Sequence, residues 1–294
     1  MVHLLRIKIL VLVITLILIV VLISYTFIPL IRGVDGSVTR TLRFSGVALR
    51  PVKSCMLVVV VDNNPNPKNK ELVTGWGVSI LIRTSANTTI LFDTGPNPEV
   101  LKHNMEVLGI DPKSIDFVVI SHEHGDHVGG LPYIAKVKPG IKVYVPSGMS
   151  ENVKDWIKGL GLNVVEVSDT TVVTDGIAIV GQLYGPPYEQ ALAVNVEGLG
   201  LVITVGCSHP GVVNMVRKAI EDLGIKPYLV IGGFHMFWAS EEACEDVIKG
   251  LLKLNVSKIA PIHCSGDTIR SILQTKYSQH YIECYVGCDN KLMS

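Results

Sequence analysis

The chain of 294 residues has no excess charge of either sign, because 26 Lys and Arg residues balance 26 Asp and Glu residues. A nucleic-acid-binding protein normally carries a basic stripe, so this balance argues against a nucleic-acid partner. Charged residues make up only 18% of the chain and hydrophobic residues 48%, which excludes intrinsic disorder. Six cysteines are too few for a scaffold held together by disulfides. The composition therefore indicates a protein with a substantial apolar core.

One long segment lacks charge altogether. Residues 9–31 are apolar apart from four hydroxyl-bearing side chains, and the run exceeds the ~20 residues that a helix needs to cross a bilayer. A cleaved signal peptide is the alternative, but its apolar part is normally ~7–15 residues long and ends in small residues. The sequence thus predicts a single-pass membrane anchor over residues 1–32, a linker over 33–50 and one domain over 51–294. Basic residues flank both ends of the run, so the side of the membrane that holds the domain stays open.

The remainder of the chain has the pattern of an α/β domain. Strands run in two batches, each followed by helices, which predicts two sheets packed face to face with helices outside. Ser240 is expected to cap the helix that begins at Glu241. Cys284 and Cys288 are close enough for a disulfide, although spacing alone does not show one. We expect strands over 55–61, 77–83, 88–92, 115–120, 142–145, 164–167, 177–183, 191–196, 199–205, 228–231 and 259–262, and helices over 99–108, 212–223, 241–254 and 268–274.

The densest cluster of reactive side chains follows the expected strand 115–120. His122, His124, Asp126 and His127 lie within six residues, and a glycine between the two pairs lets the backbone turn. Imidazole and carboxylate together are typical ligands of first-row metals. The spacing predicts one metal at the first two histidines and a second metal at the Asp–His pair.

Three more histidines, His209, His235 and His263, each lie at the end of an expected strand. In a chain that already carries a dinuclear-type motif, His209 and His263 are predicted ligands. His235 is a candidate catalytic residue together with Asp126, and ordinary packing is its alternative interpretation.

Cys207 lies two positions before His209, and side chains two apart in an extended segment point the same way. Cys207 is therefore predicted to be a metal ligand or its neighbour, with a small apolar plug as the alternative. Cys264 either lines the site or only packs against neighbouring residues. Trp238 is the candidate for stacking on a ring of the substrate.

The motif H-x-H-x-D-H at 122–127, preceded by LFDTG at 91–95, resembles the metallo-β-lactamase superfamily. GCSHPG at 206–211, GGFH at 232–235 and HCSG at 263–266 resemble one group within it, which includes the 7,8-dihydropterin-6-methyl-4-(β-D-ribofuranosyl)aminobenzene 5′-phosphate synthase of methanopterin biosynthesis. The resemblance implies a four-layer αβ/βα sandwich with two divalent metals at one sheet edge. It also implies that His209 completes the first metal site, that His263 completes the second, and that Asp93 orients a ligand histidine. Cys207 stands where the superfamily commonly has a bridging Asp.

Two divalent ions held by one carboxylate and neutral imidazoles leave a positive site, which favours a small anionic substrate. Zinc is the expected ion, and iron or manganese suits the same ligands. A metal-bound hydroxide could attack an ester or phosphoester, so the expected function is that of a hydrolase. The resemblance implies a synthase-type transferase as the alternative. A membrane-tethered metal-binding protein without turnover is a third hypothesis.

Overall fold

The computed structural model describes residues 48–293, so the predicted membrane anchor at 9–31 lies outside the described residues. Between residues 48 and 293, no helix is both long and apolar enough to span a bilayer. Leu49, near the end of the predicted linker, is buried, and its carbonyl accepts a hydrogen bond of 2.8 Å from Nδ2 of Asn195. The packing of the domain thus extends back at least to Leu49.

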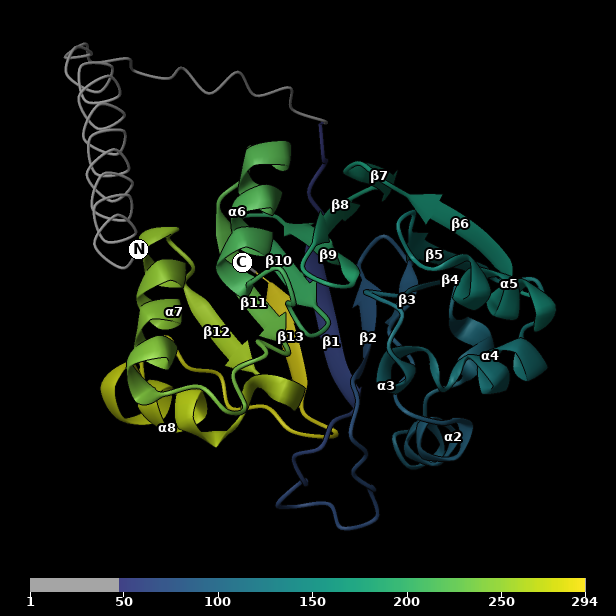
Figure 1. Ribbon diagram of the computed structural model, residues 1–294, viewed down its shortest axis with the longest axis horizontal. Coiled ribbons are helices and arrows are strands. Elements are labelled where there is room, and N and C mark those ends of the chain that lie inside the picture. Colours follow the sequence, from purple (N-terminus) through teal and green to yellow (C-terminus); the bar gives the residue numbers. More distant parts are fainter. Residues whose placement is uncertain (1–47, 294) are drawn as a thin grey trace, which may run out of the picture. The chain divides into compact units, whose positions relative to one another are not determined.

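Two β-sheets form the centre of the domain (Figure 1). The seven-stranded sheet has the order β13-β1-β2-β3-β4-β5-β6, and the six-stranded sheet has the order β12-β11-β10-β9-β8-β7. Strands β3 to β6 pair in parallel, as do β10 to β12. The strands of the first sheet are β1 (Ser54–Val61), β2 (Ser79–Thr84), β3 (Thr89–Phe92), β4 (Phe117–Val119), β5 (Lys142–Pro146), β6 (Asn163–Val167) and β13 (Asp289–Met293). Those of the second are β7 (Thr171–Thr174), β8 (Ile177–Tyr184), β9 (Tyr188–Val196), β10 (Gly200–Val205), β11 (Pro227–Gly232) and β12 (Lys258–Pro261).

Helices cover the outer face of each sheet, which gives four layers (Figure 1). Alternate side chains of a strand face opposite ways: Ile80 and Ile82 of β2 lie in the core between the sheets, whereas Leu81 packs with the helices. The first sheet is covered by α2 (Pro98–Val107), α4 (Leu131–Val137) and α5 (Glu151–Gly159), and the second by α6 (Val212–Leu223), α7 (Glu241–Lys253) and α8 (Asp267–Lys276). The predicted αβ/βα sandwich is confirmed.

The long apolar elements agree with prediction, and the Ser240 cap is confirmed because Oγ accepts from the backbone N of Ala243 at 3.2 Å. Five helices and strands were missing from the prediction: α3 (Gly125–Val128), α4, α5, β7 and β13. The last of these has the polar sequence DNKLM and exists because it pairs antiparallel with β1 at the sheet edge. Its local sequence gives little preference for a strand.

A disulfide joins Cys284 and Cys288, whose Cα atoms lie 5.6 Å apart. The sequence left this pairing open. Two backbone hydrogen bonds fasten the closed loop to β1: Val59 N donates to Cys288 O at 2.9 Å and Gly287 N donates to Val59 O at 2.7 Å.

Candidate metal centre

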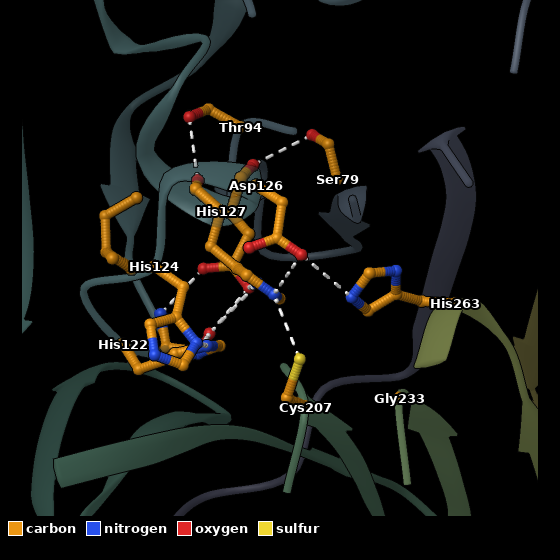
Figure 2. Close-up of polar contacts among 12 residues, drawn as sticks. Ser79, Thr94, His122, His124, Asp126, His127, Cys207, Gly233 and His263 are labelled. Atoms are coloured by element: carbon orange, nitrogen blue, oxygen red, sulfur yellow. Dashed lines mark hydrogen bonds and ion pairs between the residues drawn. The ribbon is translucent and has the colours of Figure 1, made fainter. Parts of the chain in front are cut away.

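The predicted ligands converge at one edge of the two sheets, where strands from both sheets end (Figure 2). His122, His124 and the short helix α3 (Gly125–Val128) follow β4, Cys207 and His209 follow β10, and His263 follows β12. Thr94, just after β3, donates from its backbone N and its Oγ1 to His127 O at 2.8 and 2.9 Å. Segments far apart in the sequence are therefore tied together at this edge.

Backbone conformation also marks this edge. Six non-glycine residues of the described chain have positive φ, and four of them lie here: Asp93, Ser208, His235 and His263, with φ between 50° and 61°. Such conformations cost about 1–3 kcal/mol each when the residue is not glycine, and they cluster at functional sites. The fold accepts this strain where the candidate ligands lie.

The first donor set consists of His122, His124 and His209. His122 Nε2 lies 3.1 Å from His124 Nδ1 and 3.3 Å from His209 Nε2. Nitrogens at ~2.0–2.1 Å from one tetrahedral zinc would lie ~3.3 Å from each other. The three rings are thus spaced as ligands of a single ion.

The second donor set consists of Asp126, His127, Cys207 and His263. His127 Nε2 lies 3.2 Å from Cys207 Sγ and 3.7 Å from Asp126 Oδ2. His263 Nε2 is buried and makes no hydrogen bond, although it lies 3.3 Å from the same Asp126 oxygen. A buried imidazole nitrogen without a partner is costly unless something else binds it. The donors and this orphaned nitrogen fit a divalent ion.

His235 belongs to a third, overlapping group with Cys207 and His209. Its side chain is exposed, and its ring centroid lies 4.6 Å from that of His209. The structure therefore places His235 at the open rim of the centre, beside the first donor set.

Asp93, fully buried after β3, supports two of the ligands from behind. Its Oδ2 accepts from His127 Nδ1 at 2.7 Å and from Ser121 Oγ at 2.7 Å, while Oδ1 accepts from Ser121 N at 2.7 Å. Ser121 Oγ also lies 2.9 Å from Nδ1 of His122. The carboxylate fixes His127 with a proton on Nδ1, which leaves Nε2 free to bind a metal.

Glu189 plays a corresponding part for the loop after β10, and it was missed in the sequence. This fully buried carboxylate accepts from the backbone N of Cys207 at 2.9 Å, of Ser208 at 2.8 Å and of His209 at 2.8 Å. Its burial raises its pKa to about 7. The available signal was the only charged residue of a buried strand, near its start.

Asp62 anchors the third ligand loop and was also missed. Its Oδ1 accepts from His263 N at 2.8 Å, and its Oδ2 accepts from Asn64 Nδ2 at 2.9 Å. Asn63 Oδ1 lies 3.2 Å from His263 Nδ1. Asp62 ends an apolar strand, as Asp93 does, and that shared position was the signal. Every ligand loop thus rests on one buried carboxyl group.

The imidazoles differ in proton affinity. Burial lowers the pKa of His209 to about 4, and burial together with the charge of His127 lowers that of His122 well below its usual range. Burial also disfavours charge on His127, but the attraction of Asp93 outweighs it and raises the pKa to about 8. The carboxyl of Asp126 is kept ionised, because the neighbouring imidazoles outweigh burial and lower its pKa to about 2. Neutral histidines and an ionised carboxylate are the forms that bind metals.

Cys264 lies directly behind Cys207, and its Sγ donates to Cys207 O at 3.8 Å. In the protein alone, the hydrogen bond with Cys264 and burial raise the pKa of the Cys207 thiol. A divalent ion at the second donor set would reverse this by stabilising the thiolate.

Trp238 is 85% exposed and reaches the centre only through its neighbours. Its ring packs on Phe237 at 4.8 Å, which packs on Trp76 at 5.5 Å, and Trp76 lies 5.3 Å from the ring of His263. Of these two tryptophans, Trp76 is therefore the one whose ring lies beside a candidate ligand.

Comparison with known proteins agrees with this geometry. Residues 75–217 match the family model described as metallo-beta-lactamase superfamily. The 7,8-dihydropterin-6-methyl-4-(beta-D-ribofuranosyl)-aminobenzene-5′-phosphate synthase of Methanocaldococcus jannaschii is 33% identical over an alignment of 258 residues, covering 72% of this chain and 88% of the synthase. A crystal structure described as a metal-dependent hydrolase of the beta-lactamase superfamily has a TM-score of 0.67 at 24% identity, over 82% of this chain and 100% of that one, and shows the shared fold. The chain belongs to the metallo-beta-lactamase superfamily.

Proposed function

We propose that the protein is a metal-dependent hydrolase of a small ester or phosphoester. The observation that carries the proposal is the first donor set, which offers three imidazoles where a closed structural zinc site would have four protein ligands. His124 is exposed and His209 is half-buried, so the fourth coordination position, which no residue of this set fills, lies on the solvent side. This arrangement favours catalysis over a metal-binding protein without turnover.

Bound divalent ions, with zinc as our proposal and iron or manganese as alternatives, would supply a nucleophile by lowering the pKa of water and would polarise an ester oxygen. His122, His124 and His209 would hold one ion, and Asp126, His127, Cys207 and His263 the other. Asp126 stays ionised and keeps the second set together.

His235 is proposed as the residue that protonates the leaving group. It stands exposed at the rim, beside His209. The hydrogen bond with Cys264 raises the pKa of His235, which is the direction that favours the protonated imidazole that a general acid needs.

A synthase-type transferase is the second candidate, favoured by the 33% identity to the synthase from Methanocaldococcus jannaschii. The same positive centre could hold a diphosphate leaving group while an organic nucleophile attacks. The two functions differ in whether water or an organic group is the acceptor.

The test uses the full chain in detergent, loaded with zinc, and assays phosphodiesters, carboxylic esters and lactones, followed by a dihydropterin diphosphate with ribofuranosylaminobenzene phosphate. Hydrolysis should stop with a chelator and return with zinc, and His124→Ala should lower it. His103→Ala is the matched control, because His103 is an exposed histidine of α2 that hydrogen-bonds Glu71 O. Joining of the last pair without hydrolysis would show the transferase instead.

A further inference from the structure

A pocket of about 400 Å³ adjoins the first donor set on the side of His124. One side of its lining comes from Glu123 and His124, and the other from Tyr184 and Tyr188 with the two prolines between them. None of the functions described so far uses these tyrosines. The pocket is separate from the Trp76 side of the centre, which adjoins His263.

The tyrosines stand at the tip of the hairpin formed by β8 and β9. They are the last cross-strand pair before the turn, with ring centroids 4.9 Å apart and planes at 57°. Gln182 holds this tip to the turn after β5: its Oε1 accepts from Gly148 N at 2.7 Å, and its Nε2 donates to Ser147 Oγ at 2.8 Å. The aromatic wall is therefore fastened to the neighbouring sheet.

Two glycines show how closely the tip of this hairpin packs against the neighbouring loops. A Cβ at Gly148 would lie 2.2 Å from Cδ2 of Tyr188, so the tyrosine ring lies directly on the glycine backbone. A Cβ at Gly185, in the turn, would lie 2.3 Å from the backbone N of Pro210, next to His209. The hairpin thus touches the loop that carries a candidate ligand. Tyr188 also directly precedes Glu189, the carboxylate that holds that loop.

The chemistry of the lining selects among ligands. Tyrosine and proline present flat apolar faces that suit a planar ring. Among the lining residues, Glu123 carries the only formal negative charge, and no lysine or arginine is present to attract an anion. Glu123 is fixed, because its Oε2 accepts from Ser150 N at 2.6 Å. A negatively charged group is disfavoured in this pocket, whereas an uncharged aromatic ring fits it.

We infer that this pocket is a substrate subsite for an uncharged planar aromatic ring, placed so that the attached ester or phosphoester lies over His122, His124 and His209. The inference rests on the proposed function and narrows its substrate to aryl-bearing compounds. Tyr184 and Tyr188 are the residues that determine this specificity.

Phenylphosphonate and methylphosphonate test the subsite, because neither is hydrolysed and both present the same anionic group. Titration calorimetry on the full zinc-loaded chain in detergent should show phenylphosphonate binding about tenfold more tightly. Gly148→Ala should push the Tyr188 ring into the pocket and abolish the preference without weakening methylphosphonate. Gly159→Ala is the matched control, since a Cβ there meets no atom within 4 Å. Tyr184→Ala, at a side chain that is 65% exposed, gives a second variant with little risk to folding and should reduce the preference several-fold.

Equal affinity for the two phosphonates in the unmodified protein would overturn the subsite, and so would a preference that survives both Gly148→Ala and Tyr184→Ala. Failure of the proposed function looks different. A phenyl preference in a protein that hydrolyses no ester would leave the subsite standing and refute the hydrolase. Hydrolysis without any preference for phenylphosphonate would support the hydrolase and refute the subsite.

Discussion

Replacing Asp93 with asparagine changes how His127 is prepared to bind a metal. Asparagine suits the backbone, because Asp93 has a φ of 54° and asparagine tolerates that region. Its oxygen can still accept from Ser121 N, but its amide nitrogen would be a donor facing His127 Nδ1. The imidazole would then have to accept at Nδ1 and carry its proton on Nε2, the atom that faces Cys207 at 3.2 Å.

The size of the effect follows from the proton affinity of His127. Burial disfavours charge on this imidazole, but the surrounding carboxylates, Asp93 foremost, raise its pKa from 6.5 to about 8. The net stabilisation of positive charge on the ring is therefore about 2 kcal/mol. An imidazole that binds a divalent ion also carries positive charge, so it gains a similar stabilisation. Asp93→Asn should therefore weaken one of the two metals by about 30-fold.

Competition with a chromophoric chelator measures the two zinc affinities, and long-range proton–nitrogen NMR reports the tautomer of His127. Asp116→Asn is the matched control, because this exposed carboxylate precedes β4 and accepts from Thr89 N, away from the centre. The reasoning is refuted if Asp93→Asn binds both ions as tightly as the unmodified protein.

Three further predictions concern the metals and the anchor. Cys207→Ala should weaken one metal about tenfold or more and Cys207→Asp should partly restore it, whereas unchanged affinity in the alanine variant would leave His209 as the only ligand of its loop. Zinc binding at pH 7 should release about two protons, one from Cys207 and one from His127, whose pKa of about 8 keeps it charged at that pH. Calorimetry in buffers of different ionisation enthalpy should show that the number of released protons falls to about one above pH 9. A proton release that does not change with pH would contradict the assignment. Residues 9–31 should keep the protein in the membrane fraction through carbonate washes, and a mature amino terminus after residue 31 would show a cleaved signal instead.

The elements that the sequence predicts well are those with a strong local pattern. Helix α7 has an N-cap, two acids in its first turn and an apolar face, and its start at Glu241 is as predicted. Helix α4 spans only seven residues after two glycines, and β7 is a four-residue strand without a buried face. Such short elements depend on neighbours that are distant in the sequence, so a local window does not reveal them.

The residues of the candidate site likewise divide into those that the sequence predicts and those that it does not. His122, His124, Asp126 and His127 lie in one linear motif, and strand ends pointed to Cys207, His209 and His263. Glu189 and Asp62 were missed because each binds backbone N–H groups of a loop far away in the sequence. Backbone amides are present everywhere, so no residue type marks the partner.

The three buried carboxylates have a consequence for how the protein matures. Asp62, Asp93 and Glu189 hold the ligand loops through protein hydrogen bonds. We therefore expect the domain to fold before any ion arrives, unlike a zinc finger, which needs its metal to fold. Metallation then becomes a separate, later event in the life of the protein. The ion acquired at that moment reflects the metal supply around the finished domain as well as the preference of its ligands.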